Sequence, residues 1–144
     1  MARIKLSLPQ NFSFSTQIPV RITDINYGNH LGNDAVLGLL HEARMQFLKK
    51  AGYSELDLAG VGLIMADVAI EFKAEAFYGD ILTAYVAAGD FSKIGFDLYY
   101  KLVKKDEEKI VAVAKTGMIC FDYEMRKVAA VPDAVRQRLD SDKL

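Results

Sequence analysis

The chain has 144 residues, of which 51% are apolar and 26% are charged, so a disordered or solvating segment is excluded. Eighteen Lys and Arg residues against nineteen Asp and Glu residues give a net charge of −1, which leaves no basic excess for binding nucleic acid. One cysteine and two histidines exclude a disulfide framework and a Cys/His zinc site of the usual type. This length suits one domain, which we expect over residues 1–144.

No apolar run approaches the ~18 residues that a membrane span needs. The first nine residues are too short and too broken for a signal peptide. We therefore expect a cytoplasmic protein without a membrane partner.

The first periodic segment runs from Phe12 to Ile22 and alternates apolar with polar residues, which predicts a half-buried strand. Pro19 cannot donate a hydrogen bond to a neighbouring strand, so this strand is expected at a sheet edge or at a bulge. The segment Asp24–Gly32 predicts a loop, because two glycines and two asparagines interrupt any period.

A long helix is predicted after this loop. Asn33 or Asp34 can cap its start, and Gly52 stands where a C-terminal cap belongs. Most positions between them are apolar, and the polar ones form a narrow stripe: Glu42, Gln46, Lys49 and Lys50. We expect protein to cover most sides of this helix.

Four further strands and a short helix complete the predicted order. The strands are expected over Ile64–Lys73, Ile81–Phe91, Phe96–Leu102 and Lys109–Phe121, and the short helix over Asp133–Leu139. Four consecutive strands with tight connections predict an antiparallel sheet, which the long helix must cover on one face. The fold class is therefore α+β. The strand over Ile81–Phe91 is apolar on both faces, and we expect no cover for the second face within the chain.

The loop Asp24–Gly32 is the candidate site. It supplies the carboxylate of Asp24, the amide of Asn26 and the imidazole of His30 next to a helix N-terminus, where unpaired N–H groups and the helix dipole can hold an oxyanion. If the chain is extended here, Asp24 and Asn26 point the same way. The alternative is that these residues serve only turn and capping chemistry.

Several motifs along the chain occur in a characteristic order. Val20–Asn26 reads Val-Arg-Ile-Thr-Asp-Ile-Asn, His30–Asn33 reads His-Leu-Gly-Asn, and His41–Arg44 reads His-Glu-Ala-Arg. Tyr78–Asp80 reads Tyr-Gly-Asp before a predicted strand. In this order the motifs resemble those of the hotdog-fold acyl-CoA thioesterases of the 4-hydroxybenzoyl-CoA thioesterase type.

The resemblance implies a hotdog fold, in which an antiparallel sheet wraps around one long central helix. It implies hydrolysis of an acyl-CoA thioester, with no metal or redox cofactor. It also implies a homo-oligomer, either a dimer or a tetramer, whose active sites lie at the dimer interface near the helix N-termini.

The chain departs from the family pattern at Asn26, Asn29, Gly32 and Val36, and the departure at Asn26 bears on the mechanism. The family has a catalytic carboxylate where this chain has Asn26, and an amide cannot take a proton from water. We expect Asp24 to be the base, Asn26 to hold the water or the carbonyl, and His30 to complete the catalytic set. Glu42 is a weaker candidate base, and the alternative role for Asp24 is to brace the loop.

Substrate-binding residues are expected around this loop and beyond it. The backbone N–H near Leu31 or Gly32 is expected to face the thioester carbonyl, while Met65 and Tyr78 are candidates for the acyl pocket or for the core. Cations at Lys73, Arg126 and Lys127 are candidates for CoA phosphates or are merely solvated. The full set of substrate-binding candidates is Tyr27, Leu31, Gly32, Asn33, Met65 and Tyr78.

Two other functions stay open at this point. Because Asn26 replaces the acidic residue of the family, the sequence also suits a hotdog module that binds acyl-CoA without hydrolysing it. A hotdog enoyl-CoA hydratase has its His five residues after the Asp, whereas His30 follows Asp24 by six and no Pro lies between them.

Overall fold

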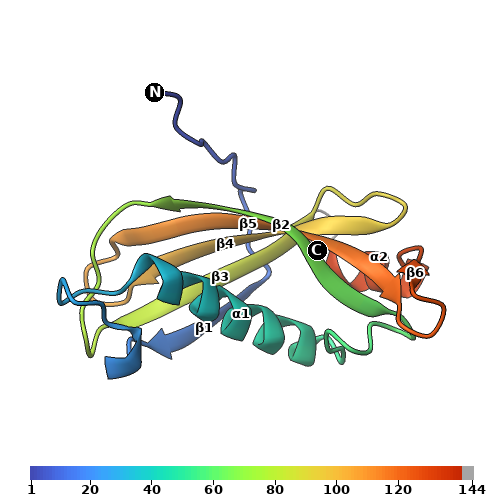
Figure 1. Cartoon of the computed structure of the whole chain (residues 1–144), viewed down its shortest axis with the longest axis horizontal. Helices are drawn as coiled ribbons and strands as arrows, with labels where there is room; N and C mark the ends of the chain where they lie inside the picture. The colour runs from blue at the N-terminus through green and yellow to red at the C-terminus, as the bar shows by residue number, and fades with distance from the viewer. Residues whose placement is uncertain (141–144) are drawn as a thin grey trace.

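The computed structural model describes residues 1–140, in which one antiparallel sheet lies against one long helix (Figure 1). Helix α1 spans Asn33–Lys50, a 3-10 turn η1 spans Ile22–Asp24, and helix α2 spans Asp133–Leu139. The strands are β1 (Phe14–Pro19), β2 (Gly62–Phe72), β3 (Ile81–Gly89), β4 (Gly95–Lys104), β5 (Ile110–Asp122) and β6 (Lys127–Val128). The predicted α+β layout is confirmed. The last four residues of the predicted domain lie outside the described residues.

The strand order is β1-β3-β4-β5-β2, and every neighbouring pair is antiparallel. β6 pairs with the end of β5. β1 is an edge strand, as Pro19 predicts, because the missing N–H of proline then leaves no gap between two strands. β2 forms the opposite edge, so its outer side has no strand partner among the described residues, although Leu63 N donates there to Glu55 O over 2.7 Å.

Helix α1 packs one face against the sheet. Its buried residues are Val36, Leu39, Leu40, Ala43, Arg44, Phe47 and Leu48. The expectation that protein covers most of its sides is not met within this chain, because Leu37 and Met45 on the outer face are each 37% exposed. Its start also differs from the prediction, since Gly32 is the cap and no side chain caps the first turn. Gly52 does adopt the left-handed conformation (φ +87°) expected after a helix.

Neither described helix combines the length and apolarity that crossing a membrane requires.

The N-terminal segment covers part of the outer face of the sheet. The Phe12 ring meets the Tyr85 ring edge-on at 6.0 Å, and Lys101 Nζ lies 5.2 and 5.1 Å from their centroids. Nearer the N-terminus, Leu6 N donates to Glu71 Oε2 on β2 over 2.8 Å. The expectation of no cover within the chain is therefore wrong for this region. The N-terminus itself projects away from the sheet (Figure 1).

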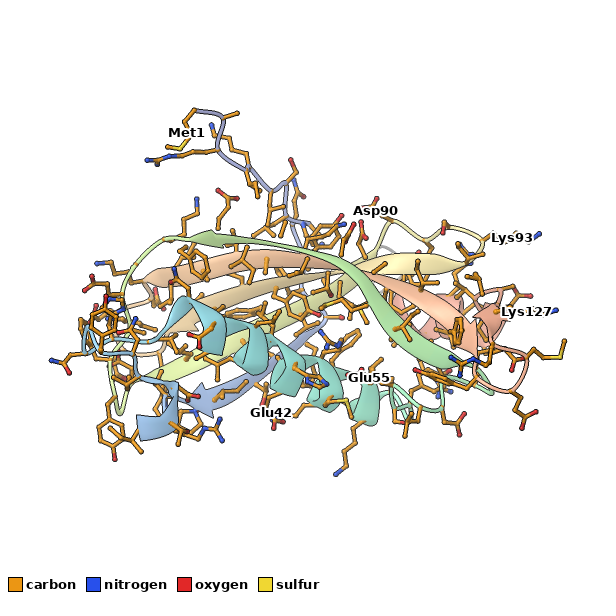
Figure 2. All side chains as sticks on the ribbon, viewed as in Figure 1. Met1, Glu42, Glu55, Asp90, Lys93 and Lys127 are labelled. Carbon is orange, nitrogen blue, oxygen red and sulfur yellow. The ribbon has the colours of Figure 1, made fainter. Side chains whose placement is uncertain are left out.

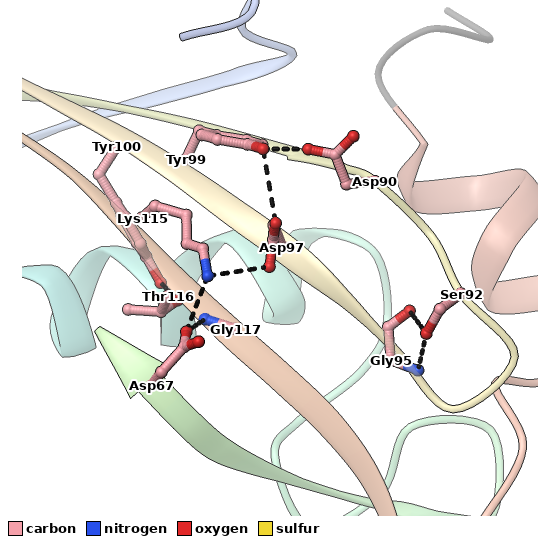
Figure 3. Close-up of polar contacts among 10 residues, drawn as sticks. All are labelled: Asp67, Asp90, Ser92, Gly95, Asp97, Tyr99, Tyr100, Lys115, Thr116 and Gly117. Atoms are coloured by element: carbon pink, nitrogen blue, oxygen red, sulfur yellow. Dashed lines mark hydrogen bonds and ion pairs between the residues drawn. The ribbon is translucent and has the colours of Figure 1, made fainter. Parts of the chain in front are cut away.

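A bulge interrupts β2 between Met65 and Asp67. The Asp67 carboxylate accepts hydrogen bonds from Gly117 N (2.9 Å) and from Lys115 Nζ (2.8 Å) (Figure 3). These side-chain hydrogen bonds join β2 to β5 at the point where the extra residue of the bulge interrupts the backbone hydrogen bonds between the two strands. The hydrogen bond from Lys115 lowers the pKa of Asp67. On the same face Lys115 Nζ also lies 3.5 Å from Asp97 Oδ1. These contacts fix the register of the edge strand.

A polar row crosses the core between α1 and the sheet. Arg44 Nη1 donates to the Tyr100 hydroxyl over 3.2 Å, and this hydroxyl lies 2.7 Å from Thr116 Oγ1. Arg44 Nε donates to Glu55 Oε1 over 3.3 Å, and His41 Nε2 lies 2.8 Å from the same oxygen. Arg44 is 5% exposed, and its charge is therefore paired at the rim of the core rather than left alone inside it. Glu55 is labelled at that rim in Figure 2.

Candidate functional site

The loop between η1 and α1 is a closed turn held by its own backbone. Asn26 N donates to the His30 carbonyl over 2.9 Å, and Ile25 and Leu31 form an antiparallel bridge. The Asn26 side chain serves the same turn, because its Oδ1 accepts from Gly28 N over 2.9 Å. Such a hydrogen bond from an Asn side chain to the backbone two residues on is a common turn device. The amide oxygen at the position of the family carboxylate is therefore engaged within the loop.

Asp24 lies beneath this turn and is 6% exposed. Its Oδ2 accepts from Arg21 N over 2.8 Å, and both carboxylate oxygens lie 3.3 Å from the Arg21 guanidinium. The condition that Asp24 and Asn26 share a face of an extended segment is not met, since Ile22–Asp24 forms a 3-10 turn. This geometry suits the bracing alternative, while the role of base stays a prediction.

The expected oxyanion donors at Leu31 and Gly32 need a correction. Leu31 N donates to Ala76 O over 2.7 Å and Gly32 N donates to Asp24 O over 3.0 Å, so both N–H groups are occupied. The first helical hydrogen bond runs from Val36 N to Gly32 O. The N–H groups of residues 33–35 precede it and have no acceptor among the described residues. The donors available at this helix end therefore begin one residue later than expected, at Asn33.

A cavity of about 240 Å³ opens at this helix end. His30, Leu31 and Asn33 line it from the loop and the first turn of α1, while Lys73 and Glu75 line it from the segment after β2. The loop and this segment are joined by the hydrogen bond from Leu31 N to Ala76 O. Three predicted site residues, His30, Leu31 and Asn33, thus share this cavity with the carboxylate of Glu75. No motif in the sequence marks Glu75, because only this contact between two loops places it there.

The remaining predicted substrate-binding residues lie outside this cavity. Tyr27 is fully exposed at the tip of the loop, Tyr78 is 66% exposed in the turn before β3, and Met65 is 40% exposed on β2. The alternative of core packing for Met65 and Tyr78 is therefore wrong in this chain. Glu42 lies on the outer face of α1, where Gln46 Nε2 donates to it over 2.8 Å. It lines a different hollow of about 470 Å³ between β1 and α1.

The three candidate cations separate in space. Lys73 lines the cavity, and its Nζ lies 3.3 Å from Glu71 Oε1. Arg126 lies in the turn between β5 and β6 and Lys127 begins β6, and Lys127 is labelled at that end in Figure 2. The cavity contacts Val111 at the other end of β5, and at ~3.3 Å per residue that strand separates the two places by ~35 Å. Of these three candidate cations, Lys73 alone lines the cavity within one chain.

Comparison with known proteins agrees with this architecture. The long-chain acyl-CoA thioesterase FadM of Escherichia coli K12 is 23% identical over 126 residues, which are 87% of this chain and 96% of FadM. The structure of a 1,4-dihydroxy-2-naphthoyl-CoA thioesterase from Synechocystis superposes with a TM-score of 0.80 at 22% identity, covering 90% of this chain and 97% of that one. DHNA-CoA thioesterase from Staphylococcus aureus gives a TM-score of 0.73 at 17% identity, covering 81% and 78%.

The hotdog fold expected from the motifs is confirmed by these superpositions. The family model of the thioesterase-like superfamily matches residues 20–139, which include the candidate loop, α1 and the whole sheet beyond β1. The chain belongs to the thioesterase-like superfamily.

Proposed function

We propose that this protein hydrolyses an acyl-CoA thioester to the free acid and CoA. Membership of the thioesterase-like superfamily and the likeness to acyl-CoA thioesterases support this reaction. The observation that carries it is the cavity at the start of α1, where unpaired backbone N–H groups adjoin an imidazole and a carboxylate. Thioester hydrolysis needs these elements, namely a donor for the oxyanion and an acceptor for the proton of water.

The proposed oxyanion donor is the backbone N–H of Asn33. It stands at the first helical position, where the helix dipole adds positive potential, and its residue lines the cavity. Asn26 and Asp24 keep the loop that feeds this helix end in place, through Gly28 N and Arg21 N respectively.

The proposed assembly is a homodimer through β2, either alone or paired into a tetramer. Beyond Leu63 the outer edge of β2 has no strand partner among the described residues, and Met65, Val68 and Phe72 along it are 40%, 40% and 49% exposed. A free apolar strand edge pairs readily with another strand. If two copies of β2 pair antiparallel, the Gly62 end of one approaches the Phe72 end of the other. Met65 of a second copy would then lie close to the cavity, which explains how it can serve the acyl group.

The experiment is release of CoA thiol from a panel of acyl-CoA esters, followed with a thiol-reactive dye. Asn33→Pro is the informative variant, because proline is well accepted at the first helical position but carries no N–H. Asn33→Ala is its control, since it removes the side chain and keeps the N–H. We expect Asn33→Pro alone to lose about 10²–10³ in kcat, the usual cost of one oxyanion donor. Equal activities would contradict this placement of the site.

A second candidate function is binding of acyl-CoA without hydrolysis. The observation that favours it is Asn26, whose amide cannot take a proton from water and whose amide oxygen is engaged with Gly28 N. Stoichiometric binding of acyl-CoA in calorimetry, with no thiol released over hours, would establish this function instead. An enoyl-CoA hydratase would likewise release no thiol but would consume the enoyl absorbance.

A further inference from the structure

The hydrogen bonds around His30 fix which ring nitrogen carries the proton. Nδ1 lies 3.1 Å from the carbonyl oxygen of Leu31. A carbonyl oxygen only accepts, so Nδ1 must be the protonated nitrogen in this contact. In the neutral ring Nε2 therefore presents a lone pair. That nitrogen is the one that faces Glu75.

The Glu75 carboxylate stands opposite this lone pair. Its Oε1 is 4.0 Å from His30 Nε2, too far for a direct hydrogen bond. A water molecule at ~2.8 Å from each atom spans such a gap, since the two acceptors would then subtend an angle of about 90° at its oxygen. Both protons of that water point at acceptors, so an oxygen lone pair is left for attack. Two acceptors facing each other across this distance are arranged to bind and orient water.

Fold stability does not account for this pair. The side chains of His30 and Glu75 are 30% and 64% exposed, and exposed ion pairs contribute little to stability. Both residues nevertheless line the same cavity, with the free N–H of Asn33 on its wall. Lys73 also lines this cavity, but its ammonium group is paired with Glu71. The pair is placed where the chemistry of a thioesterase would be.

We propose that Glu75 and His30 together activate the hydrolytic water, and that Glu75 supplies the carboxylate that Asn26 lacks; this inference rests on the proposed thioesterase function. The water oxygen adds to the thioester carbonyl carbon, and its proton passes to His30 Nε2. The negative charge that develops on the carbonyl oxygen is held by the N–H of Asn33. The C–S bond then breaks with its electron pair on sulfur, and the proton on Nε2 passes to the departing thiolate. Glu75 orients the water and stabilises the imidazolium between the two transfers.

The test compares Glu75→Ala with Glu124→Ala. Glu124 is an exposed carboxylate in the turn before β6, at the far end of β5 from the cavity. For Glu75→Ala we expect a loss in kcat of about 10² or more, with the KM for acyl-CoA unchanged, because the lost group acts on water and not on binding. Glu124→Ala should behave as the unchanged protein. Thermal melts of both variants check that they fold.

Added formate separates a chemical role of Glu75 from a structural one. A small carboxylate can occupy the space vacated in Glu75→Ala, so formate should restore part of the lost kcat while chloride at the same concentration should not. The double variant of His30 and Glu75 should be little slower than His30→Ala, since residues that act as a unit are not additive.

Three outcomes overturn the inference. If the unchanged protein releases thiol and Glu75→Ala retains its kcat, Glu75 has no part in the reaction while the proposed function stands. If kcat falls without rescue by formate and the melting temperature falls too, Glu75 is structural. If the folded, unchanged protein releases no thiol from any ester of the panel, the proposed function fails and this inference fails with it.

Discussion

The guanidinium of Arg44 on α1 meets the hydroxyl of Tyr100 on β4 inside the layer between helix and sheet, with 3.2 Å between Nη1 and the hydroxyl oxygen. Tyr100 is fully buried, and burial raises the pKa of its hydroxyl. The same hydroxyl lies 2.7 Å from Thr116 Oγ1 on β5. One phenol group thus ties the central helix to two strands of the sheet.

Tyr100→Phe tests this tie. The substitution removes one hydroxyl and leaves a buried donor of Arg44 and the hydroxyl of Thr116 each short of a partner, which costs about 1–3 kcal/mol. We expect the free energy of unfolding in urea to fall by that amount. The control is Tyr123→Phe, whose ring is 47% exposed, and it should leave the unfolding free energy unchanged. Equal stabilities of the two variants would show that the hydrogen bonds of the Tyr100 hydroxyl do not hold α1 to the sheet.

Asp24→Asn separates the two roles considered for Asp24. A general base would lose about 10²–10⁴ in kcat. A brace would instead lose stability, since a neutral amide cannot form an ion pair with the Arg21 guanidinium. Because both oxygens of Asp24 face Arg21, we expect a lower melting temperature and a kcat close to that of the unchanged protein. A large loss of kcat at an unchanged melting temperature would restore Asp24 as the base.

Gly117→Ala is expected to open the bulge of β2. A Cβ at Gly117 would stand 2.4 Å from Asp67 Oδ1, so the carboxylate must leave its place between Gly117 N and Lys115. We expect a loss in unfolding free energy on the order of 1–3 kcal/mol, as for other overpacked sites. In the background of Asp67→Ala the same change should cost much less. Purely additive costs in this double-mutant cycle would contradict the coupling.

Val68→Lys tests the proposed dimer. A lysine on a free strand edge opposes pairing with a second strand, because its charge would be buried on association. We expect light scattering at micromolar concentration to give a dimer or tetramer for the unchanged protein and a smaller species for this variant. Val128→Lys, at a similarly exposed valine on β6, is the control and should keep the assembly. A monomer for the unchanged protein would refute assembly through β2.

The buried thiol of Cys120 should make the unfolding free energy of the protein depend on pH. Burial raises its pKa to about 11, whereas the unfolded thiol ionises near its ordinary value of about 8.5. The raised pKa therefore contributes stability below about pH 8.5, and this contribution is lost as the pH rises toward 11. We expect the difference in unfolding free energy between the unchanged protein and Cys120→Ala to shrink over that range. A constant difference would show that the thiol ionises equally in both states.

The sequence by itself determined the order and type of the main elements. Alternation in the strands and apolar periodicity in α1 are local properties, and Pro19 carries its own reason for standing at an edge. The motifs around the loop before α1 were sufficient to predict the hotdog fold, because each lies within a few residues of the chain.

Only the tertiary structure decided which groups meet. Glu75 reaches His30 because Leu31 N pairs with Ala76 O, and no local pattern encodes a hydrogen bond between loops 45 residues apart. The expected donors at Leu31 and Gly32 were wrong for the same reason, since their acceptors come from elsewhere in the fold. The exposed face of α1 was missed because apolar residues report a tendency to be buried and not the partner that buries them. Local periodicity fixes elements, whereas a site depends on contacts between them.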